Sequence, residues 1–550
     1  MKARFATNAR RAHWMLLLVI VVSSSGLLLR GLDSDYIALW DEVVHLNVVQ
    51  NLVTDCCTPR LHVREFETDY RDWTDNNVWL HKPPLPFLMN AAFAAGWPRS
   101  PLAMRLPSLL FAEAIVVLVF LVGLRFFDSW SATLAAAGFA FNHYTFELVQ
   151  GRQFSGIPDL TLVCFLMGAL YCLLAIAELP RRKHFIGFGL YAGLAFLCKD
   201  GLALVPFAVL AAVVLRLGWR QHAAGFLSAT SIALLIAGSS TAYLTFLFPV
   251  EATYEQQHRV AHLFGDVEGW SRPVDYYFSV YFRRITSPLI AGVGFLCVAW
   301  GILRWAGQPR VAVLAMWILS YLVFLSAGVS KVSNFIYPTA PVLYLLMAVL
   351  LTTLWRRADY QSILAGSSTI LATAVILQFD LFGSLRWIGH SATPLSRFGL
   401  PLFQWVVFGG SLAALRMAPV GAVPKFVAAS ACAAVLVVLG ASVRANVAAP
   451  DRRPRDFDHQ LALRQAALAL PRHLDPHAIV LVRWDGVMKS HLYVKFWSGL
   501  ESLEVNDRHP LEARLALVKR EPAVYLLADS ALPSYAPPVR VGQGYLHKMK

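Results

Sequence analysis

Residues 38–45 read Ala-Leu-Trp-Asp-Glu-Val-Val-His and place an acidic pair, Asp41-Glu42, about ten residues after the first long apolar run. The pair opens a polar loop in which residues 81–85 read His-Lys-Pro-Pro-Leu, and the sequence around that loop is apolar. A carboxylate beside a membrane surface can take a proton from an acceptor hydroxyl, and a nearby lysine can hold a phosphate. The stretch therefore predicts a polar site at the edge of a membrane.

The composition places the chain among integral membrane proteins. Its 550 residues are 57% hydrophobic and only 15% charged, and the mean hydropathy is +0.53. A soluble domain cannot bury this much apolar surface, so we expect a polytopic α-helical membrane protein. The formal net charge of +14 fits this class, because basic residues gather on one side of a membrane protein. Nucleic acid is not an expected partner, since the basic residues punctuate apolar runs instead of forming a patch.

Neither the seven cysteines nor the N-terminus predicts a separate function. Five cysteines lie in apolar runs, and the pair Cys56-Cys57 has no Cys-x-x-Cys metal spacing, so we expect no redox or zinc chemistry from them. The basic N-terminus before the apolar run at 14–32 is compatible with a signal peptide. The run continues through Leu27-Leu28-Leu29, which favours an uncleaved membrane anchor.

Apolar runs of membrane-crossing length predict about thirteen transmembrane helices. They lie at 14–32, 103–124, 130–149, 159–178, 185–198, 201–217, 223–249, 286–303, 311–328, 335–354, 361–382, 398–415 and 426–445. A further stretch, 84–97, is short and begins in a proline-rich sequence. We expect it to lie along the interface and not to cross the membrane.

The distribution of charge predicts the orientation of the chain. With the N-terminus in the cytoplasm, the short cytoplasmic connections are all basic, as the positive-inside rule requires. The longer loops, 33–102 and 250–285, then lie outside, together with the C-terminal segment 446–550. Helix-like and strand-like patterns alternate in that segment, which predicts a small α/β domain after a membrane domain of residues 1–445.

This topology gathers acids, histidines and cations at one membrane face, which suits a reaction on a lipid whose phosphate lies at the interface. The gathered residues are Asp41, Glu42, His45, His81, Lys82, Arg105, Arg152, Asp159, Lys199, Asp200, Glu251, His258, His262, Arg272, Lys331 and Tyr337. The i, i+4 pair His258 and His262 is also a candidate for binding a divalent metal, with His81 as a third ligand.

The acidic candidates have structural interpretations as well. Asp41 and Glu42 can be the acids that favour the N-terminus of a helix. Asp159 opens an apolar run after Pro158, which is a good position for a helix cap. Capping and catalysis are compatible at that position.

The basic candidates have structural interpretations of their own. Lys82 can anchor the chain by extending to lipid headgroups, and Lys331 can be a plain interface cation between two spans. For Lys199-Asp200, the sequence favours a self-neutralising tight turn over a functional role.

Five short motifs, taken in order, resemble the GT-C class of polyprenyl-phosphate-sugar glycosyltransferases. The nearest members are the bacterial lipid A 4-amino-4-deoxy-L-arabinose transferases (ArnT type), which are related to the protein O-mannosyltransferases. The resemblance covers about residues 14–345. The motifs are Asp41-Glu42, the His-Lys-Pro-Pro-Leu stretch at 81–85, Met104-Arg105-Leu106-Pro107-Ser108, the segment from Arg152 to Asp159, and Ser330-Lys331 with Tyr337-Pro338 and Pro341.

The resemblance implies a GT-C fold and the transfer of a sugar, with an aminoarabinose-like pentose favoured, from undecaprenyl phosphate to lipid A or another surface acceptor, with inversion at the anomeric carbon. A protein O-mannosyltransferase-like enzyme that acts on a protein hydroxyl is the enzymatic alternative. It implies that Asp41 is the general base, that Glu42 belongs with it to the catalytic residues, and that Asp159 is a second carboxylate. The implied donor-phosphate ligands are Lys82, Lys331, Tyr337 and Arg272.

The resemblance also implies a monomeric protein of the bacterial inner membrane, with the active site and the C-terminal domain in the periplasm. A divalent metal ion is the one cofactor to consider. The chain departs from the aminoarabinose transferases at Val43-Val44-His45, where they continue the acidic pair with Ser-Arg-Tyr, and at His81, where they have an acid. The sugar therefore stays open, and a lipid transporter or flippase is the non-enzymatic alternative. That alternative predicts internal repeats, and no clear repeat occurs in the sequence.

Overall fold

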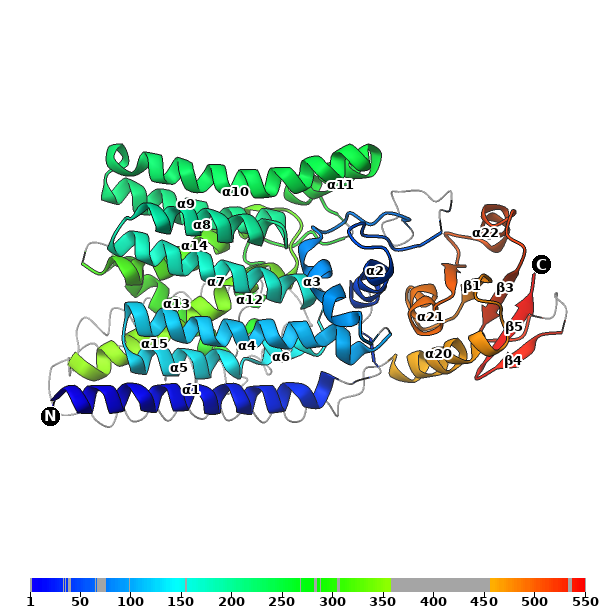
Figure 1. Ribbon diagram of the computed structural model, residues 1–550, viewed down its shortest axis with the longest axis horizontal. Helices are drawn as coiled ribbons and strands as arrows, with labels where there is room; N and C mark the ends of the chain where they lie inside the picture. Colours follow the sequence, from blue (N-terminus) through cyan, green and yellow to red (C-terminus); the bar gives the residue numbers. More distant parts are fainter. Residues whose placement is uncertain are drawn as a thin grey trace, which may run out of the picture.

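The computed structural model describes residues 2–32, 34, 36–37, 41–64, 66, 76–97, 99–153, 156–267, 269–280, 284–286, 288–303, 307–357, 456–532 and 537–549. The long helices of the first part lie side by side in a bundle, and a smaller domain with a sheet lies beyond one end of it (Figure 1). Helices suit the apolar sequences of the bundle because a helix satisfies every backbone hydrogen bond within its own segment.

The helices of the first part are α1 (Lys2–Leu32), α2 (Asp41–Thr54), α3 (Leu85–Ala94), α4 (Pro101–Phe126), α5 (Ser129–Ala140), α6 (His143–Val149), α7 (Gly156–Glu178), α8 (Arg182–Phe196), α9 (Asp200–Leu217), α10 (Trp219–Leu247), α11 (Pro249–Phe264), α12 (Tyr276–Val280), α13 (Pro288–Leu303), α14 (Pro309–Ala327), the 3-10 helix η2 (Ser333–Thr339) and α15 (Ala340–Arg357).

Within the described residues, seven helical segments are long and apolar enough to cross a membrane, so the chain is a multi-pass membrane protein. They are α1, α4, α7, α9, α10, α14 and the continuous segment of η2 and α15. The predicted spans at 361–382, 398–415 and 426–445 lie outside the described residues, and the total of about thirteen stays a prediction. The stretch at 84–97 forms the ten-residue helix α3, which is too short to span a bilayer.

The predicted span at 130–149 is wrong as a single helix, because the chain breaks into α5 and α6. The Asn142 side chain makes the break: its Oδ1 accepts from the Thr145 backbone N–H at 3.0 Å and so caps α6. Its Nδ2 donates to the backbone oxygen of Ile285 at 2.7 Å and to the Tyr344 hydroxyl at 3.1 Å. An asparagine buried among helices thus satisfies its polar atoms by ending one helix and starting another.

The C-terminal part is an α/β domain with a five-stranded sheet in the order β2-β1-β3-β5-β4. Strand β1 pairs in parallel with β2 and β3, whereas β5 pairs antiparallel with β3 and β4. The alternation of helix and strand that the sequence predicts for this segment is present. The elements are α20 (Phe457–Ala469), η3 (Leu470–Arg472), β1 (Ile479–Arg483), α21 (Ser490–Ser498), β2 (Glu501–Glu504), α22 (Leu511–Leu517), β3 (Val524–Ala528), β4 (Val539–Val541) and β5 (Gly544–Lys548).

Helix α2 lies between the bundle and the C-terminal domain (Figure 1). Its apolar side chains share one buried cluster with α20 and α21, including Val44 and Leu46 on one side and Leu463 and Leu492 on the other. The loop after α2 makes polar contacts with the same domain: His62 Nδ1 lies 3.0 Å from Glu501 Oε2, which also accepts from Lys495 Nζ at 2.6 Å. The acidic pair that begins α2 is therefore held at the junction of the two parts.

Candidate active site

Asp41 is the first residue of α2 and forms a largely buried ion pair with Lys82. Lys82 Nζ donates to Asp41 Oδ2 at 2.6 Å and to His45 Nε2 at 3.1 Å. Residues 41 and 45 share one face of the helix because they are four positions apart, so both meet the same lysine. Burial by itself raises the pKa of Asp41, but the Lys82 ammonium and His45 hold it well below its usual range. Burial, followed by Lys82, lowers the pKa of His45.

A second buried ion pair joins three other segments. Asp159, in the first turn of α7, accepts from Lys199 Nζ at 2.7 Å through Oδ1 and from Asn334 Nδ2 at 2.6 Å through Oδ2. Lys199 precedes α9, and its ammonium lies 4.6 Å from the centre of the Phe335 ring. Both carboxylate oxygens of Asp159 are thus held by donors. The pair ties α7, α9 and η2 together at one end of the bundle.

The two ion pairs act on each other electrostatically and belong to one site. Burial lowers the pKa of Lys199, and Asp159 opposes that effect. Lys82 lowers the pKa of Lys199 further, and Asp41 raises it. The site consists of two carboxylates and two ammonium groups arranged as neighbouring pairs, with His45 beside them. We call Asp41, Lys82, Asp159 and Lys199 the four-charge cluster.

Glu42, the second acid of the pair, lies away from the four-charge cluster and binds Arg105 of α4. Arg105 Nε donates to Glu42 Oε1 at 2.7 Å and Nη2 donates to Oε2 at 3.2 Å. Arg105 also donates to the backbone oxygens of Leu32 and Ser34 and of Tyr36. Glu42 therefore fixes the start of α2 to the bundle, and its place among the catalytic residues stays a prediction.

Residue 151 is a glycine because the backbone there passes close to the Glu42 side chain. Gly151 has φ +67°, a backbone conformation in the left-handed region, and a Cβ atom there would collide with the Glu42 carboxylate. A side chain at residue 151 would displace the buried Glu42–Arg105 pair.

We expect Arg105→Leu to destabilise the protein by about 3–5 kcal/mol, because it leaves the Glu42 carboxylate buried without its cation. Thermal unfolding in detergent measures the effect. Arg125→Leu is a control on the same helix: Arg125 pairs with Glu178 at 3.1 Å but is 52% exposed, so its loss is expected to cost at most about 1 kcal/mol. Equal shifts in the two variants would contradict the structural role of Arg105.

The other predicted phosphate ligands lie elsewhere in the polar end of the bundle. Lys331 is 2% exposed, and its ammonium donates to the backbone oxygens of Arg272 at 3.0 Å and of Gly328. The Tyr337 hydroxyl lies 2.8 Å from Thr145 Oγ1, inside the bundle. Arg272 is exposed and donates to the oxygens of its own loop. In this structure Lys331 and Tyr337 make hydrogen bonds within the protein. That they bind the donor phosphate stays a prediction.

The three histidines proposed as metal ligands lie near one another, and their binding of a metal stays a prediction. His81 Nδ1 lies 3.2 Å from Glu255 Oε2, and its ring lies 5.5 Å from that of His258. The rings of His258 and His262 lie 5.1 Å apart at an interplanar angle of 89°. Among the residues that the structure describes, no group of three or more His, Cys, Asp or Glu side chains has a geometry that could hold a metal ion. His81 instead joins the 81–85 stretch to α11.

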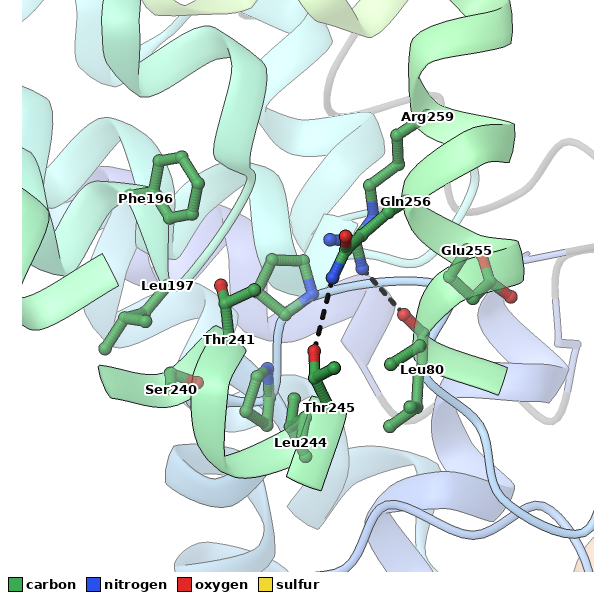
Figure 2. A pocket seen from close by; sticks show the side chains of 13 residues that line it. Leu80, Phe196, Leu197, Ser240, Thr241, Leu244, Thr245, Glu255, Gln256 and Arg259 are labelled. Carbon is green, nitrogen blue, oxygen red and sulfur yellow. Dashed lines mark hydrogen bonds between the residues drawn. The ribbon is translucent and has the colours of Figure 1, made fainter. Parts of the chain in front are cut away.

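A hollow lies between the segment after Leu80, the end of α8, and helices α10 and α11 (Figure 2). Its lining adjoins both lysines in the chain, because Pro83 and Pro84 follow Lys82 and Leu197 lies two residues before Lys199. Arg259 closes one side through a 2.7 Å hydrogen bond to the backbone oxygen of Leu80. The lining residues are Leu80, Pro83, Pro84, Phe196, Leu197, Ser240, Thr241, Leu244, Thr245, Ala252, Glu255, Gln256 and Arg259.

The mixture of side chains in the hollow suits an amphipathic ligand. Leucine, proline and phenylalanine provide an apolar wall, while hydroxyl groups and Arg259 provide polar contacts. A polar cluster with two ammonium groups beside such a wall can take a molecule with an anionic head and a hydrocarbon tail.

Comparison with known proteins identifies similar glycosyltransferases. A family profile described as dolichyl-phosphate-mannose-protein mannosyltransferase matches residues 81–243. The undecaprenyl phosphate-alpha-4-amino-4-deoxy-L-arabinose arabinosyl transferase of Pseudomonas paraeruginosa is 27% identical over 387 residues, which cover 61% of this chain. The match spans 65% of the length of that relative.

Solved structures match over nearly the whole chain. ArnT from Cupriavidus metallidurans, crystallised with undecaprenyl phosphate, has a TM-score of 0.63 at 14% identity, covering 96% of this chain and 97% of that one. The oligosaccharyltransferase of Archaeoglobus fulgidus has a TM-score of 0.51 at 10% identity, covering 94% of this chain and 68% of that one. This chain has the GT-C glycosyltransferase fold. The expected fold class is confirmed.

Within this GT-C fold, sequence reasoning placed Lys199 at the polar face but favoured a turn over a role in the site, and it missed Asn334. Lys199 does not neutralise its neighbour: it pairs with Asp159, while Asp200 Oδ2 pairs with Arg259 Nη1 at 2.9 Å. The expected self-neutralising turn is therefore wrong. The predicted topology places Lys199 on the outer side of the membrane, together with Asp159 and Lys82. That shared side was the sequence signal that could have assigned Lys199 to the site. Nothing in the sequence pointed to Asn334.

Proposed function

We propose that the protein is a membrane glycosyltransferase that moves a sugar from a polyprenyl phosphate to an acceptor at the outer face of the bacterial inner membrane. An aminoarabinose-like pentose is the favoured sugar, and lipid A is the favoured acceptor. The observation that carries the proposal is the largely buried Asp41–Lys82 pair, at 2.6 Å, whose lysine precedes Pro83 and Pro84 of the hollow. A carboxylate that can act as a base thus lies beside a cation that can bind phosphate.

The four-charge cluster can serve both ends of the reaction. The donor phosphate replaces Asp41 as the partner of Lys82, and Asp41 then accepts the proton of a hydroxyl or singly protonated phosphate acceptor. The acceptor oxygen attacks the anomeric carbon, and the bond from that carbon to the phosphate oxygen breaks. The bonding electrons leave with the phosphate, whose growing charge the Lys82 ammonium stabilises. A single displacement of this kind inverts the anomeric centre.

The remaining charges support the same assignment. Lys199 supplies a second ammonium near Lys82, while Asp159, held by Lys199 and Asn334, is a rigid acceptor that can orient the sugar. The apolar lining of the hollow suits part of a polyprenyl chain. The pairing also explains how the buried Asp41 carboxylate stays ionised without a substrate, since Lys82 is its cation.

The choice of sugar and acceptor rests on the relatives. The arabinosyl transferase of P. paraeruginosa favours aminoarabinose. The mannosyltransferase profile includes the segment from His81 to Asp159 and favours transfer of mannose to a protein hydroxyl as the second candidate.

A transfer assay separates the two candidates. The purified protein in lipid nanodiscs is incubated either with undecaprenyl-phosphate aminoarabinose and lipid A or with a polyprenyl-phosphate mannose and a serine-rich peptide. Mass spectrometry then measures the gain of one sugar on the acceptor. We expect a gain on lipid A. A gain only on the peptide supports the second candidate, and no transfer from any polyprenyl-phosphate sugar rules out the proposed function.

A further inference from the structure

The C-terminal domain reaches back to the linker that precedes Asp41. Gln460 of α20 and Tyr493 of α21 both bind the backbone of Ile37. Gln460 Nε2 donates to the Ile37 oxygen at 3.0 Å, and Gln460 Oε1 accepts from the Ile37 N–H at 3.3 Å. The Tyr493 hydroxyl donates to the same oxygen at 2.8 Å and accepts from Gln460 Nε2 at 3.2 Å. We call these two side chains on Ile37 the clamp.

The clamp is enclosed by protein. Ile37 is 0% exposed, Tyr493 2% and Gln460 5%. Hydrogen bonds shielded from water are stronger than exposed ones, and a buried backbone group that loses its partner is destabilised. The backbone of Ile37 therefore has a strong preference for one position relative to the C-terminal domain.

A second contact from the same domain holds α2 itself. Asn47 Nδ2 donates to the backbone oxygen of Leu492 in α21 at 3.0 Å and to that of Val43 at 2.8 Å. Asn47 is 1% exposed. The C-terminal domain thus binds the chain on both sides of Asp41, four residues before it and six residues after it.

These contacts leave the catalytic carboxylate little freedom. Ile37 and Asp41 are four residues apart, and an extended chain of that length spans at most about 14 Å. From the bundle, Arg105 binds Glu42 and the backbone of Tyr36. Asp41 lies between a contact with the bundle and a contact with the C-terminal domain, and its own side chain faces Lys82.

We propose that the C-terminal domain completes the active site by positioning Asp41, and that Gln460 and Tyr493 are positioning residues acting through Ile37. This rests on the proposed function of Asp41 as the base. Catalytic rates are sensitive to such placement, because a displacement of about 1 Å can cost about 10²-fold. Neither side chain contacts the substrate in this role.

The test replaces the clamp by side chains of similar size in the full-length protein. Tyr493→Phe removes the hydroxyl, and Gln460→Met removes both amide contacts to Ile37, together with those to Tyr493 and Asp456. We expect the double variant to lower kcat by about 10- to 100-fold, with Tyr493→Phe alone in between and the donor KM within about twofold of wild type. Ser502→Ala is the control, because Ser502 is buried in the same domain but its hydroxyl binds the Leu500 backbone oxygen.

Hydrogen–deuterium exchange supplies a readout that does not depend on activity. We expect faster exchange of the 36–54 segment in the double variant, with unchanged exchange in α4 and in the sheet. Unchanged exchange of this segment, or an equal loss of kcat in Ser502→Ala, would overturn the positioning role. If wild type transferred no sugar, the proposed function would fall, and exchange alone would still decide whether the clamp holds α2. Tyr493→Phe keeps the test available if the double variant does not fold.

Discussion

Asp41→Asn is expected to lower the rate of sugar transfer by about 10²- to 10⁴-fold, the usual range for loss of a general base. The amide keeps the size of the side chain but cannot accept the acceptor proton. It also leaves Lys82 without its anionic partner before the donor binds, so donor affinity is expected to be kept or to rise. The measurement is single-turnover transfer from an undecaprenyl-phosphate sugar, together with binding of undecaprenyl phosphate.

Asp200→Asn is the matched control for this variant. Asp200 also pairs with a cation, Arg259, at 2.9 Å, but its side chain is 25% exposed. We expect its loss to change transfer by less than about tenfold, as for other partly exposed ion pairs. Transfer by Asp41→Asn at the wild-type rate would remove Asp41 from the mechanism.

Lys82→Met is expected to lower kcat/KM for the donor by about 10²- to 10³-fold, comparable to removal of one group that stabilises developing charge. The methionine keeps much of the buried stem but removes the ammonium that meets the leaving phosphate. Initial rates at varied donor concentration measure the effect.

Arg272→Met is the control for Lys82, because Arg272 is an exposed cation of the same polar end. Its side chain binds the oxygens of its own loop, so a smaller effect on kcat/KM is expected. An equal fall in both variants would assign the donor phosphate to Arg272 as well. Wild-type kinetics for Lys82→Met would contradict the phosphate role of Lys82.

The pH dependence of kcat/KM tests whether Lys82 keeps Asp41 ionised, in addition to binding the donor phosphate. In the free enzyme, burial raises the pKa of Asp41, but the Lys82 ammonium lowers it by more, so Asp41 stays ionised from pH 5 to pH 8. Burial, followed by Lys82, lowers the pKa of His45, which favours its neutral form. We expect neither group to produce an acid limb there in wild type. In Lys82→Met the buried carboxyl loses its cation, and its acid limb is expected to move upward.

The Asp41–Lys82 pair also contributes to the free energy of unfolding, in a way that depends on pH. Because folding lowers the pKa of Asp41, its stabilising effect is complete above the usual carboxyl pKa of about 3.9 and is lost as the pH falls through the lower folded value. We therefore expect this pair to cause no change in the unfolding midpoint between pH 5 and pH 8. A drop in that interval that Asp41→Asn abolishes would contradict the low pKa.

Most of the membrane fold could be predicted from the sequence because apolar length is a local property. The runs at 159–178 and 201–217 coincide with α7 and α9, since a segment in lipid must satisfy its own backbone. The break at Asn142 could not be predicted in this way. It depends on the backbone of Ile285 and the hydroxyl of Tyr344, which are far away in the chain.

Only part of the candidate site could be predicted from the sequence. Asp41, Lys82 and Asp159 were marked by charge at the ends of apolar runs, where a charge is costly unless it has a partner. The partners themselves depend on packing: Lys199 had two acids within reach, its neighbour Asp200 and the distant Asp159. The structure selects Asp159, because Asp200 turns to Arg259.

By itself the amino-acid sequence determined that the chain crosses a membrane many times, that its charges gather at one face, and that a small α/β domain follows. These properties depend on composition and on spacing along the chain. Tertiary structure alone decided which acid meets which cation: Asp41 binds Lys82, and Glu42 binds Arg105. Two adjacent carboxylates meet different cations because they leave a helix about 100° apart.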